Sequence, residues 1–258
     1  MSTTQNAHGA SIEVQGLTKI YKSRGKTVTA VDNLDLTVGA GEFFSLLGVN
    51  GAGKTTTIKM LSCLSVPSAG TARIGGFDIG TQADKVRQII NVSPQNTAVA
   101  LNLTVRENLE LTAGLWGAAK ADARTATDRV IAELGLGKTA DSLARTLSGG
   151  WQRRLSIAMA LITEPSVLFL DEPTLGLDVL ARRELWNVIR ELKGRVTVIL
   201  TTHYLEEAEA LSDRIGIMAD GQLHALGTVS ELCALTGKDR FEDAFVEIVS
   251  GSAGKGED

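Results

Sequence analysis

Hydrophobic and polar positions follow two strand-like patterns along this chain. The segments at 11–14 (SIEV) and 33–38 (NLDLTV) alternate apolar and polar residues and predict half-exposed strands. Short uninterrupted apolar runs predict further strands, and the Asp-Gly step at 220–221 predicts a tight hairpin. These runs lie at 42–48, 89–92, 167–170, 196–200 and 214–218.

Helical periodicity follows several of the predicted strands. The segments 55–64, 181–192 and 206–211 have a helical pattern, and the pattern is mostly helical from 103 to about 163. Strand–helix alternation on both flanks predicts an α/β fold with a parallel sheet, and ligands of such sheets bind at the carboxyl ends of the strands. The middle of the chain is then predicted to be a helical insertion.

Composition narrows the class of protein without identifying it. The 258 residues allow one large domain or two small ones, and 43% hydrophobic with 22% charged residues is ordinary for a globular chain. A net charge of -4 gives no general attraction to nucleic acid, so no nucleic-acid partner is expected. Cys63 and Cys233 form no metal-spaced cluster and fit a reduced, cytosolic compartment with both near the core.

The two ends and the lack of long apolar runs bear on membrane contact. Residues 1–10 and 250–258 are predicted to be disordered, and the polar N-terminus is not expected to be a secretory signal. No apolar run approaches the ~18 residues of a membrane-spanning helix. Any attachment to a membrane is therefore expected to occur through a partner.

A glycine-rich loop after the strand at 42–48 carries the strongest chemical signal. Residues 48–55 satisfy the pattern G-x-x-x-x-G-K-[ST], in which glycines let successive backbone amides face phosphate oxygens. Lys54 is expected to reach the β- and γ-phosphates, and the Thr55 hydroxyl to bind Mg²⁺. The residues expected to bind nucleotide here are Gly48, Asn50, Gly51, Ala52, Gly53, Lys54, Thr55 and Thr56.

Polar residues at the ends of three other strands converge on the same edge of the predicted sheet. Asp171 is expected to hold Mg²⁺, and Glu172 to orient or deprotonate the attacking water. Gln95 follows the strand at 89–92 and can bind metal and water through its amide oxygen, and His203 can donate to a γ-phosphate. Each of these residues could instead have only a structural role. The complete glycine-rich loop at 48–55 makes this alternative less favourable for Asp171 and Glu172.

Two further features have competing interpretations from the residues alone. Tyr21 precedes the glycine-rich loop and could stack on an adenine ring, but a tyrosine near a strand end more often packs in the core. The stretch at 147–155 (LSGGWQRRL) leads into an apolar-periodic helix, so its first amides are available to a phosphate. The alternative for this stretch is a simple helix cap by Ser148.

Together these motifs resemble those of the nucleotide-binding subunits of ABC transporters, in the family's order and spacing over roughly residues 11–230. LSGGWQ resembles the LSGGQ signature, GVNGAGKTT the Walker A motif, and VLFLDE the Walker B motif. By the same resemblance Gln95 lies in the Q-loop, residues 175–178 form the D-loop, His203 is the switch histidine, and Tyr21 is the A-loop aromatic.

The resemblance implies a fold, a cofactor set and a partner. The implied fold is a P-loop NTPase (RecA-like) core with an N-terminal antiparallel β-subdomain and an inserted α-helical subdomain, using ATP and Mg²⁺. Two such domains pack head to tail, so the signature turn of one chain contacts the ATP held by the other, and a homodimer is expected. The residues implied to contact the partner's nucleotide are Ser148, Gly149, Gly150 and, in the D-loop, Asp178.

The implied domain boundaries follow from the motif positions. One ABC ATPase domain is expected over 11–235, with its core at 11–95 and 164–235 and its helical insertion at 96–163. Residues 236–258 are expected to form a short C-terminal extension with a disordered tail.

The segments 163–186 and 202–215 resemble the single-domain ATPases of ABC-2-type exporters. This resemblance implies a separate integral membrane permease and a location at the cytoplasmic face of the cell membrane. Leu115 and Trp116 are candidates for the groove that receives the permease, with core packing as an equal alternative. The runner-up interpretations are an ABC-type ATPase acting on ribosomes or DNA and a P-loop kinase.

Two positions depart from the family pattern. Trp151 replaces the glutamine of LSGGQ, cannot supply its amide hydrogen bonds, and is expected at the dimer seam. Val49 replaces a proline of the Walker A motif at a position whose side chain contacts no phosphate. Neither change is expected to prevent hydrolysis.

Overall fold

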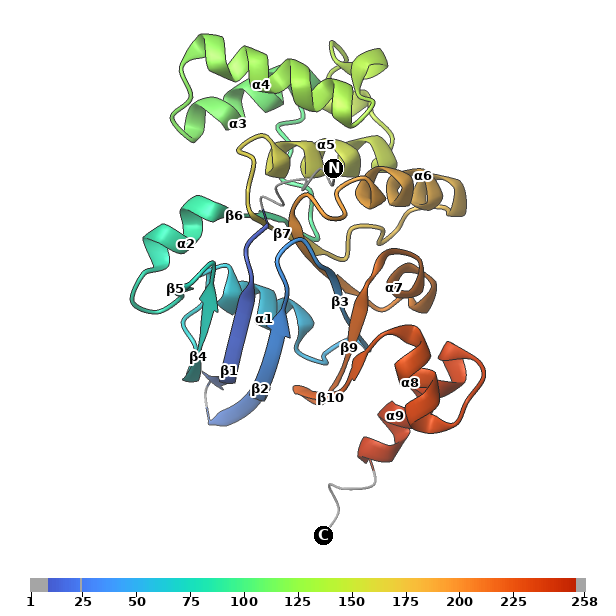
Figure 1. Cartoon of the computed structure of the whole chain (residues 1–258). Helices are drawn as coiled ribbons and strands as arrows, with labels where there is room; N and C mark the ends of the chain where they lie inside the picture. Colours follow the sequence, from blue (N-terminus) through green and yellow to red (C-terminus); the bar gives the residue numbers. More distant parts are fainter. Residues whose placement is uncertain (1–8, 24, 254–258) are drawn as a thin grey trace, which may run out of the picture.

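The computed structural model describes residues 9–23 and 25–253, and it contains two β-sheets with helices around them (Figure 1). The larger sheet has six strands in the order β10-β9-β3-β8-β7-β6, and all but β10 run parallel to their neighbours. Its strands are β3 (Phe43–Gly48), β6 (Ile90–Ser93), β7 (Val167–Asp171), β8 (Thr197–Thr202), β9 (Arg214–Ala219) and β10 (Gln222–Gly227). Each predicted apolar run forms one of these strands, because a strand covered on both faces needs no polar side.

The predicted hairpin near residue 220 is also present. Asp220 and Gly221 both have positive φ, at 50° and 81°, between the antiparallel strands β9 and β10. Two consecutive residues of this conformation make the tight turn that joins adjacent antiparallel strands.

The smaller sheet is antiparallel, with the order β2-β1-β4-β5. It consists of β1 (Ile12–Ser23), β2 (Lys26–Val38), β4 (Ala69–Ile74) and β5 (Phe77–Asp78). Both β1 and β2 are much longer than the predicted segments 11–14 and 33–38. Their pairing shifts register at several points between Val14 and Ile20, and such bulges break the period-two pattern on which the prediction relied.

Helix α1 (Lys54–Leu61) lies against both sheets. A single hydrophobic cluster contains Ile12 of β1, Phe44 of β3 and Ile58 of α1, so the core continues from one sheet to the other. This packing holds the start of α1 at the carboxyl end of β3. Helix α2 (Ala83–Ile89), which the sequence did not predict, links β5 to β6.

The predicted helical region at 103–163 contains α3 (Val105–Leu115), α4 (Lys120–Glu133) and α5 (Gly149–Leu161). These helices lie at the opposite end of the molecule from α8 (Val229–Thr236) and α9 (Phe241–Ala253) (Figure 1). Their hydrophobic core is continuous with that of β7, β8 and α6 (Val179–Arg190), so the insertion is joined to the larger sheet through apolar contacts.

The remaining helices are α7 (Leu205–Leu211), α8 (Val229–Thr236) and α9 (Phe241–Ala253). The predicted disorder from residue 250 onward is wrong for 250–253, because these residues continue α9, whose apolar side chains pack on β9 and α7. Residues 1–8 and 254–258 lie outside the described residues. Ala10 is held in place, since its amide donates to Ser166 O at 3.3 Å and its carbonyl accepts from Thr197 Oγ1 at 2.8 Å.

Cys63 and Cys233 are half-buried free thiols at the margins of hydrophobic clusters, as predicted. Within residues 9–23 and 25–253, no helix has both the length and the apolar character needed to cross a membrane.

Candidate active site

The glycine-rich loop connects β3 to α1, and its shape depends on glycine at two points. A Cβ on Gly48 would lie 2.2 Å from Met218 O, and a Cβ on Gly53 would lie 2.4 Å from Ala30 O. Gly53 also has a φ of 100° and caps α1 without any side-chain hydrogen bond to the helix amides. The first amides of α1 therefore face an open space, where the helix dipole favours an anion.

Lys54 is 6% exposed and directly follows the last glycine of this loop. Its ammonium donates to Gly48 O at 2.7 Å and Val49 O at 3.2 Å, and it is 3.5 Å from Glu172 Oε1. A buried cation needs such partners, because isolated burial of a charge is costly. These contacts hold the ammonium at the mouth of the loop, where phosphate oxygens are expected.

Asp171 is the last residue of β7 and accepts two hydroxyl hydrogen bonds. Thr55 Oγ1 donates to Asp171 Oδ1 at 3.0 Å, and Thr201 Oγ1 donates to the same oxygen at 2.6 Å. Thr201 was not predicted, although it is the register partner of Asp171 on β8 and lies two residues before His203. These hard oxygen donors fit Mg²⁺, which binds one or two protein oxygens and completes its shell with phosphate and water.

Within the described parts of the chain, no group of three or more His, Cys, Asp or Glu side chains is placed to hold a metal ion.

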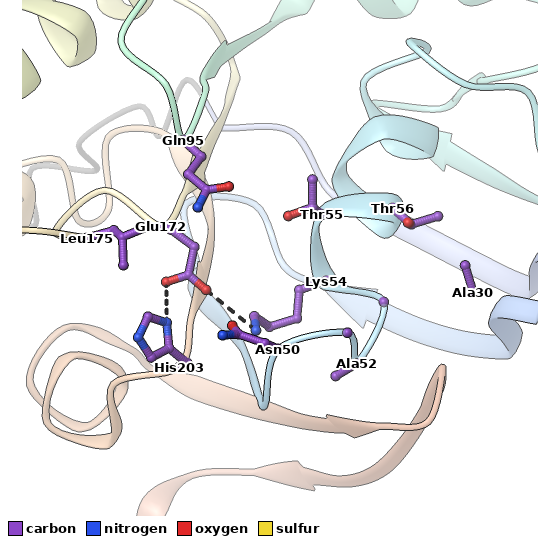
Figure 2. Close-up of a pocket in the computed structure, with 12 residues that line it drawn as sticks. Ala30, Asn50, Ala52, Lys54, Thr55, Thr56, Gln95, Glu172, Leu175 and His203 are labelled. Atoms are coloured by element: carbon purple, nitrogen blue, oxygen red, sulfur yellow. Dashed lines mark hydrogen bonds and ion pairs between the residues drawn. The ribbon is translucent and has the colours of Figure 1, made fainter.

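Glu172 lies between the cation of Lys54 and the imidazole of His203 (Figure 2). Its Oε2 is 2.8 Å from His203 Nδ1, and its backbone has a φ of 48°, an uncommon conformation for a non-glycine residue. The Glu172 amide donates to Thr201 O at 3.1 Å, which fixes this turn of the backbone. Backbone strain of this kind is typical of functional sites, where the surrounding structure holds it in place.

The loop, Glu172 and His203 enclose one pocket, and Gln95 faces it from the loop after β6 (Figure 2). Ten of the residues that the sequence singled out line this pocket, together with Leu175, the first residue of the implied D-loop, and Ala30, which carried no sequence signal. The ten are Asn50, Gly51, Ala52, Gly53, Lys54, Thr55, Thr56, Gln95, Glu172 and His203.

Tyr21 does not line this pocket. It is exposed on β1 and pairs in register with Val28, two positions along β2 from the pocket residue Ala30. The Lys19 ammonium lies 5.2 Å from its ring centroid. Stacking of Tyr21 on adenine stays a prediction.

The signature turn, defined here as Ser148–Gly150, also lies outside the pocket. Ser148 and Gly149 are exposed, and the Ser148 side chain makes no capping hydrogen bond to α5. A Cβ on Gly150 would be 3.2 Å from Ala181 Cβ, so the turn packs beside the start of α6. Asp178 caps that helix by accepting from the amides of Leu180 and Ala181, both at 2.9 Å.

Trp151 has a packing position within its own chain. The ring is half-buried against the hydrophobic core of the helical insertion, and the Arg154 guanidinium lies 4.5 Å from its centroid. This arrangement is a cation–π contact, which accounts for an aromatic residue at this position. Its placement at a dimer seam stays a prediction.

Comparisons with known proteins agree with this geometry. The family model described as ABC transporter matches residues 31–175, more than half of the chain. The chain is 44% identical over 230 residues to the daunorubicin/doxorubicin resistance ATP-binding protein DrrA of Streptomyces peucetius, covering 89% of this chain and 68% of that protein. It is 42% identical over 240 residues to the doxorubicin resistance ATP-binding protein DrrA of Mycobacterium tuberculosis, covering 93% and 70%.

A solved structure of a dimeric ATP-binding cassette in a post-hydrolysis state, bound to ADP and Pi, superposes with a TM-score of 0.75. It is 27% identical and covers 84% of this chain and 98% of its own. The chain belongs to the ABC transporter family, as an ATP-binding and ATP-hydrolysing subunit of the ABC-2-type exporter group.

Proposed function

We propose that two copies of this chain hydrolyse ATP at sites shared between them and thereby drive export through a separate membrane permease. The observation that supports this most directly is the division of the site. The pocket around Lys54 and Glu172 is assembled within one chain, whereas the signature turn is exposed and outside it.

ATP phosphates would lie on the amides of the glycine-rich loop, with Lys54 against the β- and γ-phosphates. Thr55, Asp171 and Gln95 would hold Mg²⁺. When bound, Mg²⁺ neutralises phosphate charge and so lowers the barrier to phosphoryl transfer. Two of these residues are already close, since Thr55 Oγ1 is 3.0 Å from Asp171 Oδ1.

Glu172 would orient the attacking water and accept its proton. The water oxygen bonds to the γ-phosphorus in line with the leaving oxygen, the bond to the β-phosphate breaks, and ADP and phosphate result. His203 Nδ1 lies 2.8 Å from Glu172 Oε2 and would donate to this carboxylate. Donation from Nε2 to the γ-phosphate at the same time requires a proton on both ring nitrogens.

The signature turn of the second copy would complete each site. The free amides at the start of α5 and the positive end of its dipole suit the γ-phosphate of a nucleotide held elsewhere. Exposed apolar side chains beside the turn, Val179 and Leu180, support burial against another protein surface. Contact of Asp178 with that nucleotide is part of the proposal, although one of its carboxylate oxygens already caps α6.

The permease would dock on the helical insertion near α3. Leu115 and Trp116 are 78% and 50% exposed, so core packing does not account for them, and Trp116 borders a surface hollow with Gln88 and Ala126. Docking there would place the chain at the cytoplasmic face of the membrane. Export, rather than import, is supported by relatives named for daunorubicin and doxorubicin resistance.

Glu172→Gln tests the proposed chemistry. The amide keeps the shape of the side chain but accepts a proton poorly, so turnover should fall roughly 1000-fold. ATP binding should remain near the parent value, and ATP should shift the variant to a dimer in size-exclusion chromatography. Glu206→Gln is the control, because Glu206 is exposed and does not line the pocket. Parent-like turnover by Glu172→Gln would refute the assigned chemistry.

A further inference from the structure

Arg153 connects the helix of the signature turn to the loop that carries Gln95. It lies in the first turns of α5 and is 5% exposed. Its guanidinium donates from Nη1 to Pro94 O at 2.7 Å and from Nη2 to Gln95 O. One side chain therefore spans from α5 to the backbone of a pocket residue.

The two accepting carbonyls lie just beyond a sheet edge. β6 ends at Ser93, whose register partner on β7 is Leu170, so the carbonyls of Pro94 and Gln95 lie past the strand ladder. A planar guanidinium presents two donors at a fixed spacing and can bind both carbonyls at once. We call this pair of hydrogen bonds the fork. A shorter side chain, or one with a single donor nitrogen, could not form it at position 153.

Main-chain oxygens accept from the buried guanidinium, and within residues 9–23 and 25–253 no carboxylate forms a hydrogen bond with it. Burial lowers the pKa of the Arg153 guanidinium, and the negative charges of Asp171 and Glu207 oppose that shift. A buried cation with main-chain partners is costly to keep unless those hydrogen bonds form. The arrangement therefore fixes the Pro94–Gln95 backbone relative to α5.

A second contact joins the same two elements one turn along the helix. Ser156 Oγ lies 3.0 Å from Ser93 Oγ, and both side chains are buried. With Arg153 it attaches α5 to the end of β6 at two points. A shift at the start of α5 is then transmitted to the loop carrying Gln95.

We infer that Arg153 is a positioning residue that holds the Gln95 side chain toward Thr55 and Glu172 and couples Gln95 to the signature turn. This inference rests on the proposed function, in which that turn contacts the second copy's nucleotide. Through Arg153, engagement of one nucleotide by the turn adjusts Gln95 at the other. The two ATP sites of a dimer are thereby linked.

Arg153→Gln, Gln95→Ala and the double variant test the inference by steady-state ATP hydrolysis and by hydrogen exchange of the nucleotide-free chain. Arg153→Gln should lower kcat and raise the half-saturating Mg²⁺ concentration, each roughly 10-fold, as loss of a residue that orients a ligand typically does. KM for ATP should change little. The double variant should be no slower than Gln95→Ala alone, because both changes act through one residue.

Amide exchange at residues 95–100 should become faster in Arg153→Gln, a readout that requires no ATP or metal. Arg153→Lys keeps the charge but not the fork, so it should recover part of the lost kcat. Arg129→Gln is the matched control, because Arg129 is a half-buried arginine of the helical insertion whose partners are Glu133 and Glu164. It should match the parent in both measurements.

Two results would overturn the inference. Parent-like kcat and exchange in Arg153→Gln would show that the fork does not position Gln95. Multiplicative losses in the double variant would show that Arg153 acts elsewhere. Either result would leave Glu172→Gln inactive as proposed, so failure of the inference is distinguishable from failure of the proposed function.

Discussion

The nucleotide pocket and the signature turn are both proposed to contact phosphate, but they differ in how complete they are within one chain. In the pocket, Lys54, Asp171 and Glu172 all have close partners from other strands or loops. At the turn, Ser148 and Gly149 are exposed and the helix has no side-chain cap. The pocket is preorganised within one chain, whereas the turn is exposed and its first helix amides have no side-chain cap.

The pocket and the turn would therefore contribute to catalysis in different ways. Preorganised dipoles and charges in a pocket stabilise the transition state without rearrangement at the moment of reaction. In the proposed dimer, the turn would contribute only when a second copy brings it to a nucleotide, so ATP binding and dimer closure would be one event. That coupling is what a transport ATPase needs to convert binding energy into motion.

The largest expected effect comes from blocking the turn and leaving the pocket intact. Ser148→Arg places a bulky side chain where a γ-phosphate would approach, and hydrolysis should fall roughly 1000-fold, the scale of losing preorganised transition-state donors. ATP binding to the monomer, measured by calorimetry, should be unchanged, because Ser148 does not line the pocket. Weakened monomer binding would mean that the two regions are not separate.

A smaller effect is expected from removing the hydroxyl that donates a hydrogen bond to Asp171. Thr201→Val removes the 2.6 Å hydrogen bond to Asp171 while keeping a similar volume. The Mg²⁺ concentration for half-maximal hydrolysis should rise roughly 10-fold, since loss of an outer-shell partner typically weakens metal binding by 10–100-fold. A Mg²⁺ titration with an unchanged midpoint would show that Thr201 does not orient Asp171.

The smallest effect concerns the tryptophan beside the turn. Trp151→Gln restores the residue of the family pattern but loses the ring contact with Arg154. Stability should fall by about 1 kcal/mol, or about 2–4 °C in melting temperature. Hydrolysis should stay within about 3-fold of the parent rate, because the phosphate contacts proposed for the turn come from backbone amides. A large loss of hydrolysis at parent stability would place Trp151 in the dimer seam instead.

Much of the pocket is predictable because its chemistry depends on local patterns. The loop at 48–55 needs glycines at fixed spacing, and Asp171 and Glu172 follow an apolar strand whose carboxyl end must lie at the sheet edge. Thr201 and Ala30 carry no such signal, because their importance arises from strand pairing and close packing. Threonine at a strand end is too common to identify a partner of Asp171.

The fold was least predictable where register shifts or long-range packing decide the structure. The alternation in β1 is interrupted by shifts between Val14 and Ile20, so only its first residues matched a strand pattern. The polar tail of the sequence concealed the end of α9, whose helical state depends on apolar contacts with β9 and α7. The fork from Arg153 to Pro94 and Gln95 likewise joins segments about 60 residues apart, which no local pattern reports.

The most direct test of the shared site is to mix two inactive variants, Lys54→Ala and Ser148→Arg. In a dimer with shared sites, pairing one copy of each leaves one site with an intact pocket and an intact turn. ATP hydrolysis should then recover to as much as about a quarter of the parent rate, since random association makes half of the dimers mixed. No recovery above the separate variants would contradict the account, because it would place pocket and turn in the same chain's site.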